Sequence, residues 1–158
     1  ASARQRDSEI VSHKIIGVGN QFRRDDSVGI EAARRLAGCG LGGVEIWMLS
    51  GEGAELMERW AGAAKVIVVD ASRSGAPPGT IHRLDPSSEP ILSRFFHYSS
   101  HAFGVAEAIE LARALGRLPP EMIIFGIEGQ DFSAGEGLTP VVASALETVT
   151  DLIMAEIQ

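Results

Sequence analysis

Two aspartates and one histidine lie in separate segments of the chain, each beside the end or the start of a predicted element. Asp26 follows a Gly-Val-Gly-Asn segment, Asp70 directly follows the apolar run 66–69, and His101 follows two serines before a long helical pattern. Two carboxylates and an imidazole form a mixed oxygen and nitrogen ligand set for a divalent metal ion. Three protein ligands leave positions open for water or substrate, as in reactive metal sites. Asp26, Asp70 and His101 are therefore the candidate catalytic and metal-binding residues.

Each of these residues also has a structural explanation. Asp25 and Asp26 stand where the first turn of a helix favours acidic residues, and one of them is expected to be an N-cap. Asp70 can cap the loop after its strand, and His101 can form a local hydrogen bond in the first turn of the next helix. Sequence spacing does not show proximity, so the metal site depends on a fold that brings the three side chains together.

The glycine-rich segment has a second interpretation, a dinucleotide-binding loop. That fingerprint requires a third glycine three residues after the second, and this chain has Phe22 there. Asp25 and Asp26 would also repel a pyrophosphate group at the helix start. A nucleotide-binding α/β domain is therefore the last-ranked function, and it predicts that a nucleotide raises the melting temperature whereas divalent cations do not.

The elements that must position these residues alternate between short apolar runs and longer amphipathic segments. The runs predict strands, and the amphipathic segments predict helices. The predicted strands are 15–18, 44–49, 65–69 and 122–127, with an edge strand at 80–84 between prolines. The predicted helices are 27–37, 54–61, 103–115 and a last helix that begins after Thr139. This last helix carries one apolar stripe, formed by Val142, Leu146, Val149, Ile153 and Ile157.

This alternation is typical of an α/β domain with right-handed crossovers and helices on both faces of the sheet. We predict a single domain over 14–158, preceded by a flexible arm over 1–13. Its three layers contain a twisted, mostly parallel sheet of about five strands between helices. In such sheets ligands bind beyond the carboxyl ends of the strands, where the strand order reverses, so the loops with Asp26, Asp70 and His101 are expected to converge there.

Composition limits the partners and the compartment. The chain has 158 residues, with 21 acidic and 14 basic residues and a net charge of -7, which argues against nucleic acid as a partner. The single Cys39 excludes an intramolecular disulfide and any multi-cysteine metal site, and it is expected to be a small apolar filler. Residues 1–14 lack the apolar core of a signal peptide, and the longest aliphatic run, 66–69, is far too short to cross a bilayer. We expect a cytoplasmic protein with no membrane contact.

Four ordered blocks, spread over 14–157, resemble the hydrogenase maturation protease family. They are Gly17-x-Gly19-Asn20 with Asp25-Asp26-x-x-Gly29, then Val68-Val69-Asp70-Ala71 with Pro78-Gly79-Thr80, then Ser99-Ser100-His101-x-x-Gly104, and finally Gly126-Ile127-Glu128 with Gly137-Leu138-Thr139-Pro140. Four blocks in a fixed order are far more specific than any single block. Glu128 and Asp131 follow the last strand and are expected near the rim of the site.

The resemblance implies an endopeptidase that removes the C-terminal extension from the large-subunit precursor of a nickel–iron hydrogenase after nickel insertion. The family's metal-contacting positions fall on Asp26, Asp70 and His101, with glutamate common at the first of them. The metal would be nickel carried by the substrate, although other divalent cations could occupy the site. The implied partner is the precursor, and a monomer is expected. A non-cleaving, nickel-dependent chaperone for the same precursor is the alternative, and loss of the precursor's C-terminus distinguishes the two.

Overall fold

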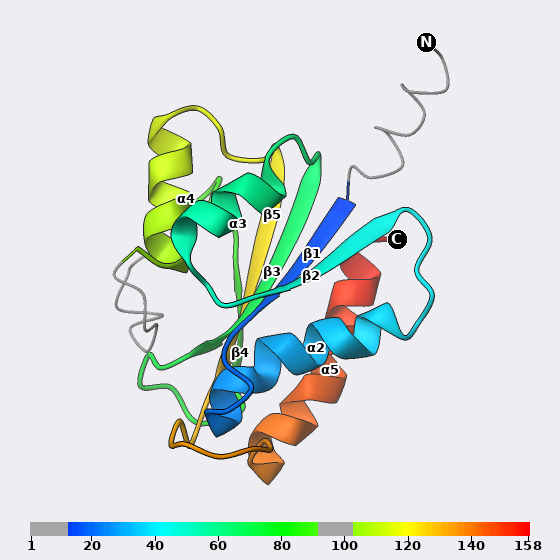
Figure 1. Cartoon of the computed structure of the whole chain (residues 1–158), viewed down its shortest axis with the longest axis vertical. Coiled ribbons are helices and arrows are strands. Elements are labelled where there is room, and N and C mark those ends of the chain that lie inside the picture. Colours follow the sequence, from blue (N-terminus) through cyan, green and yellow to red (C-terminus); the bar gives the residue numbers. More distant parts are fainter. Residues whose placement is uncertain (1–12, 92–102) are drawn as a thin grey trace.

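A single five-stranded sheet forms the centre of the computed structural model, which describes residues 13–91 and 103–158 (Figure 1). The strand order is β2-β1-β3-β5-β4, and only β4, at one edge, runs antiparallel to its neighbour. The predicted mostly parallel sheet and its edge strand are confirmed. The strands are β1 (His13–Val18), β2 (Val44–Leu49), β3 (Lys65–Ser72), β4 (Ile81–Leu84) and β5 (Glu121–Glu128).

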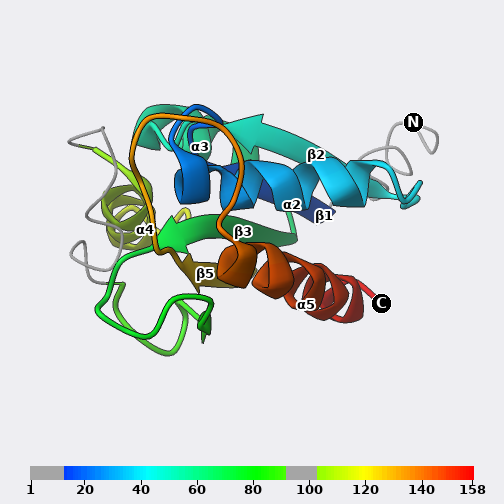
Figure 2. The same ribbon diagram turned by 90° about the horizontal axis from the view of Figure 1, so that it is seen from below.

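Helices cover both faces of this sheet, so the predicted three-layer α/β architecture is also confirmed (Figure 2). The helices α2 and α5 pack together on one face, and α3 and α4 pack together on the other. A short 3-10 helix, η1, precedes α2 directly. The helices are η1 (Arg24–Ser27), α2 (Val28–Ala37), α3 (Gly53–Trp60), α4 (Val105–Ala114) and α5 (Pro140–Glu156).

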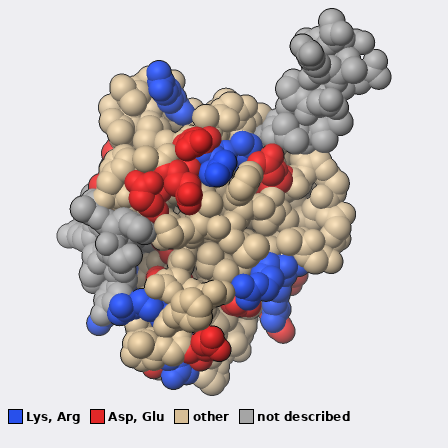
Figure 3. Space-filling view, in the orientation of Figure 1, with Lys and Arg blue, Asp and Glu red and all other residues tan. Residues whose placement is uncertain are grey.

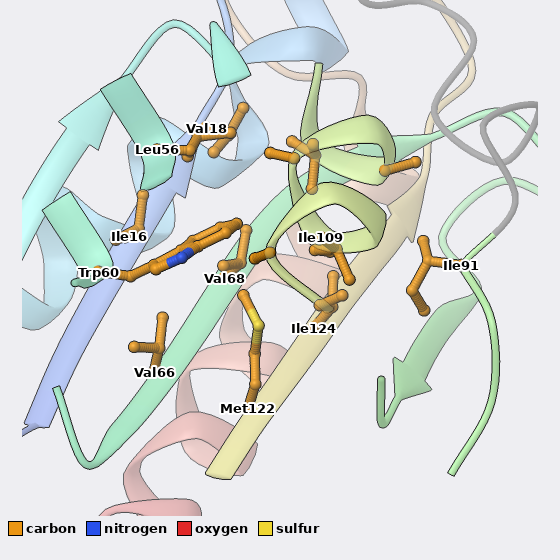
Figure 4. Close-up of a cluster of buried hydrophobic side chains, with 14 of the residues drawn as sticks. Ile16, Val18, Leu56, Trp60, Val66, Val68, Ile91, Ile109, Met122 and Ile124 are labelled. Carbon is orange, nitrogen blue, oxygen red and sulfur yellow. The ribbon is translucent and has the colours of Figure 1, made fainter. Parts of the chain in front are cut away.

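Two hydrophobic cores lie between these layers. Successive strand side chains point to opposite faces, so Val68 joins the core under α3 and α4, whereas Val69 joins the core under α2 and α5. The first core centres on Trp60 and Ile109 (Figure 4). Strands buried on both faces need uninterrupted apolar runs, which is why 66–69 is entirely aliphatic. The predicted stripe of α5 is buried in the second core, at Val142, Leu146, Val149 and Ile153.

The first turn of α2 lies directly against two strands because residue 29 is glycine. A Cβ on Gly29 would stand 2.3 Å from the carbonyl oxygen of Val69 and 2.4 Å from that of Val18. No other residue type allows this approach without moving the helix away from the sheet. The close contact fixes η1, immediately before α2, at the carboxyl ends of β1 and β3.

The surface in the orientation of Figure 1 carries charges of both signs. Basic side chains stand among acidic ones rather than forming a continuous basic face (Figure 3). Within the ranges that the structure describes, no helix is long and apolar enough to cross a membrane. Residues 1–12 lie outside those ranges, so the flexible arm stays a prediction.

Candidate functional site

The strand order reverses between β1 and β3, and two of the three predicted site residues meet there. The chain leaves β1 through α2 on one face, whereas it leaves β3 toward β4 and then α4 on the other face. In parallel sheets, ligands bind at such a point, beyond the carboxyl ends of the two strands. Asp26 lies on η1, which contacts β3, and Asp70 lies near the end of β3 itself.

Asp70 is a buried carboxyl group inside β3, not a residue after the strand as predicted. The ladder with β5 continues two residues further, to the pair Ser72 and Glu128, and Asp70 lies opposite Gly126. The Asp70 side chain is only 7% exposed, and its Oδ1 accepts a hydrogen bond of 2.8 Å from the Ala71 backbone. Burial raises the pKa of Asp70 well above its ordinary value, and the neighbouring charge of Asp26 raises it further.

Asp26 faces the same region from a half-buried position. Burial raises its pKa to about 6, and this effect exceeds the opposing effects of a hydrogen bond from the Asn20 backbone and of the Arg23 charge. Two carboxyl groups with raised pKa values, close enough for one to act on the other, form a site that favours protons or a cation. Such a pair can bind a metal ion or accept a proton from a reacting group near neutral pH.

Asp25, the neighbour of Asp26, has a different role, because its side chain is completely buried and points to another part of the chain. Its oxygens accept hydrogen bonds from the backbone N–H groups of Gln130, Asp131 and Thr139, at 2.8 to 2.9 Å. The Thr139 hydroxyl donates to it as well, at 2.8 Å. The expectation that one of the two aspartates is an N-cap is wrong, since the N-cap residues are Arg23 for η1 and Ser27 for α2. Thr139 precedes α5 as predicted, but its hydroxyl serves Asp25 rather than the helix.

Backbone hydrogen bonds strengthen this connection between the segments 20–27 and 129–139. Arg24 N–H donates to Gly135 O at 3.1 Å, and Gly135 N–H donates to Phe22 O at 2.9 Å. Arg24 has a φ of 43°, the only positive φ of a non-glycine residue in the described part of the chain. A non-glycine residue in this region of φ is strained, and the surrounding hydrogen bonds hold it there. The position of Asp26 therefore depends on the segment that follows β5.

Glu128, which was expected near the rim, is instead a buried connection between three segments. Its carboxylate accepts hydrogen bonds from the Ser74 backbone at 2.8 Å, from the Ser74 hydroxyl at 2.7 Å and from Ser72 Oγ at 3.2 Å, and it lies 3.2 Å from His82 Nε2 on β4. Burial by itself would raise the pKa of Glu128, but the hydrogen bonds from Ser74, His82 and Ser72 outweigh burial and lower the pKa. Glu128 thus holds the turn after β3 in place through Ser74, four residues beyond Asp70.

We expect Glu128→Gln to lower the free energy of unfolding by about 1–2 kcal/mol at pH 7, because an amide cannot replace every accepted bond. A carboxyl group with a lowered pKa stabilises the fold above its unfolded pKa, and this contribution is lost as the pH falls through its folded pKa. The difference between variant and wild type should therefore shrink at acidic pH. Urea unfolding at pH 7, and at the lowest pH where both proteins fold, measures this difference in the free energy of unfolding. A difference that does not change with pH would contradict the role of the charge.

The third predicted ligand, His101, lies outside the described residues, as do His97, Ser99 and Ser100. Among the residues that the structure does describe, no group of three or more His, Cys, Asp or Glu side chains could hold a metal ion. The placement of Asp26 beside Asp70 is thus known, and the complete trio stays a prediction. Cys39 is exposed rather than a core filler, with its thiol near the Arg35 carbonyl.

A doubly wound α/β domain with a carboxyl pair at its switch point defines the general class of this protein, and comparison with known proteins gives the family. A family model for hydrogenase maturation proteases matches residues 50–156. The chain belongs to the hydrogenase maturation protease family.

Individual relatives agree with this assignment. The hydrogenase expression/formation protein HupD of Thiocapsa roseopersicina is 30% identical over 144 residues, which cover 84% of this chain. The chain spans 65% of the length of that relative. The hydrogenase expression/formation protein HoxM of Cupriavidus necator is 23% identical over 139 residues, with 86% of this chain and 69% of HoxM covered. The structure of the hydrogenase maturating endopeptidase HybD from E. coli superimposes with a TM-score of 0.75 at 25% identity, covering 93% of this chain and 92% of HybD.

The sequence proposes Asp26 and Asp70 as site residues, and this role stays a prediction, whereas the structural roles of Asp25 and Glu128 were missed. The pair of adjacent aspartates was itself a signal for Asp25. A helix N-cap needs only one aspartate, so the other had to have a different role. No local pattern identified its partners, which lie more than one hundred residues further along the chain. Glu128 belongs to the fourth block of the resemblance and follows an apolar run, but neither feature predicts its bonds to Ser72, Ser74 and His82.

Proposed function

We propose that this protein is an endopeptidase that removes the C-terminal extension of a nickel–iron hydrogenase large-subunit precursor after nickel insertion. The observation that supports this most directly is the pair Asp26 and Asp70, whose pKa values are both raised at the switch point of a chain from this family. Carboxyl groups with perturbed pKa values cluster at functional sites. Neither residue contributes to a hydrophobic core, so their position together at the switch point calls for a functional explanation.

Nickel on the precursor is the proposed signal for cleavage. Two neighbouring carboxyl groups resist ionisation in the free protein, and a cation between them would offset both their repulsion and the cost of burial. A precursor that carries nickel would supply this cation, with His101 as the proposed third ligand, and a nickel-free precursor would not. Only the nickel-loaded precursor would gain this affinity for the protein. The site would therefore detect whether nickel has been inserted.

The same residues suggest how the peptide bond would be broken. Asp26, with a pKa of about 6, is ionised in a large fraction of molecules at neutral pH and can accept the proton of an attacking water. A nickel ion beside the scissile carbonyl would polarise it or lower the pKa of the bound water. Both routes require Asp26 and Asp70 to face the cleaved bond together.

The decisive experiment is a cleavage assay on nickel-loaded and nickel-free precursor, followed by intact mass measurement. Loss of a C-terminal peptide from the loaded form alone is the expected result. Cleavage of both forms would retain the protease and reject the nickel detector. Nickel-dependent binding without any loss of mass would favour the alternative, a non-cleaving chaperone for the same precursor.

A further inference from the structure

Phe22 is a large aromatic side chain that stands in solvent beside the candidate site. It is 57% exposed, more than any other large hydrophobic side chain in the part of the chain that the structure describes. It lies four residues before Asp26 in the segment that joins β1 to η1, at the carboxyl ends of the strands (the lower end of Figure 1). A single exposed apolar residue is ordinary, so its exposure by itself indicates nothing.

The segment that carries Phe22 is held in place, and this is the second observation. The Phe22 backbone N–H donates to Asn20 Oδ1 at 2.9 Å, and its carbonyl accepts from Gly135 N–H at 2.9 Å. On its C-terminal side, Arg23 Nε donates to the Phe132 carbonyl at 3.2 Å, and Arg24 N–H donates to Gly135. Phe22 is therefore presented from a fixed backbone.

The side chains of two residues that follow Phe22, Arg23 and Asp25, also hold the segment against the chain after β5. Asp25, three residues later, is fully buried in its bonds to the 129–139 segment. The chain thus fixes the backbone around Phe22 while leaving the ring itself in water. A rigid aromatic side chain of this kind loses little freedom when it binds, which favours its use as an anchor in protein interfaces.

We propose that Phe22 is a fixed apolar anchor for the hydrogenase precursor and contacts an apolar side chain of the precursor next to the cleaved bond. The inference rests on the proposed function, which brings a protein substrate to Asp26 and so to the segment that carries Phe22. The precursor is the occupant because Phe22 and Asp26 belong to one short segment at the carboxyl ends of the strands, which a hydrogen bond of 3.3 Å from Asn20 N–H to Asp26 O closes on itself. Burial of the ring against that polypeptide supplies binding energy outside the reacting centre.

The test compares Phe22→Ala with Leu115→Ala. Leu115 is also an exposed large hydrophobic residue, 54% exposed, but it follows the C-terminal end of α4, at the opposite end of the sheet from the site. Both substitutions remove the same kind of exposed apolar surface, so both should leave the melting temperature nearly unchanged. Only Phe22→Ala should weaken the interaction with nickel-loaded precursor, by about tenfold in KM with kcat nearly unchanged. Phe22→Leu, which keeps an apolar side chain, should restore most of the affinity.

Precursor binding is measured in parallel with cleavage, so that the two proposals fail separately. Weaker binding by Phe22→Ala alone supports the anchor, whether or not the wild-type protein cleaves. Equal KM and equal affinity for Phe22→Ala, Leu115→Ala and the wild type would overturn the anchor while the protease remained. If the wild-type protein neither binds nor cleaves the precursor, the proposed function and the anchor are both rejected.

Discussion

Replacing Asp70 with asparagine is expected to abolish processing of the precursor and, at the same time, to stabilise the isolated protein at pH 7. The amide has nearly the same shape as the carboxyl group and keeps an oxygen that can accept the bond from the Ala71 backbone. It cannot carry the negative charge that the proposed site supplies to a metal ion or to the reaction. We expect a loss of at least about a hundredfold in kcat/KM, within the range typical for removal of one catalytic group.

The increase in stability follows from the direction of the pKa shifts. Burial and the charge of Asp26 raise the pKa of Asp70 above that of an unfolded aspartate, and Asp26 itself has a pKa of about 6. An acid with a raised pKa binds more protons in the folded state, so its contribution to stability is fully present below the unfolded pKa and is lost as the pH rises through the folded pKa. At pH 7 the wild-type protein therefore bears a cost that Asp70→Asn removes.

The measurement is the melting temperature of wild type and Asp70→Asn from pH 4 to pH 8. A chain of this length gains about 2–4 °C for each kcal/mol. The variant should be more stable at pH 7, and the difference should disappear toward pH 4, where both carboxyl groups of the wild type are protonated. Asp151→Asn, on the exposed side of α5, is the matched control and should show neither effect. An Asp70→Asn protein that melts below the wild type at pH 7 would show that Asp70 stabilises the fold.

The sheet and its helices were predictable because their patterns are local. The aliphatic run 66–69 predicts a strand buried on both faces, and the spacing of Val142, Leu146 and Val149 predicts a helix with one buried stripe. The glycines of the first block also have a local signature, although only the structure shows that Gly29 allows α2 to contact the carbonyls of Val18 and Val69.

The boundaries and the supporting contacts of the site were less predictable because they depend on partners far away in the sequence. The prediction ended the third strand at Val69, the last residue of its apolar run. The structure extends the strand to Ser72, since the ladder with β5 continues and Glu128 binds the Ser72 hydroxyl. Asp25 and Asp26 are adjacent and chemically identical, yet one is fully buried in hydrogen bonds and the other is half-buried near Asp70. Only the position of the 129–139 segment distinguishes them.

Replacing Asp25 with asparagine is therefore expected to be among the most destabilising substitutions of a polar residue in this protein. Three backbone N–H groups and one hydroxyl donate to its two oxygens. An asparagine offers one oxygen, and its NH2 group would face donors that then lack an acceptor. Leaving such donors buried costs about 1–3 kcal/mol for each group, so we expect a total loss of about 3–5 kcal/mol.

Urea unfolding of Asp25→Asn beside Asp151→Asn measures this loss, and Thr139→Val provides a graded comparison. The valine removes only the hydroxyl donor and should cost about 1–2 kcal/mol. If Asp25→Asn unfolds at the same urea concentration as Asp151→Asn, the connection between the segments 20–27 and 129–139 does not stabilise the protein. A large loss in Asp25→Asn and a smaller one in Thr139→Val would instead mean that the position of Asp26 is set by this buried carboxylate. The adjacent aspartates would then divide two tasks, with Asp25 fixing the segment and Asp26 facing the substrate.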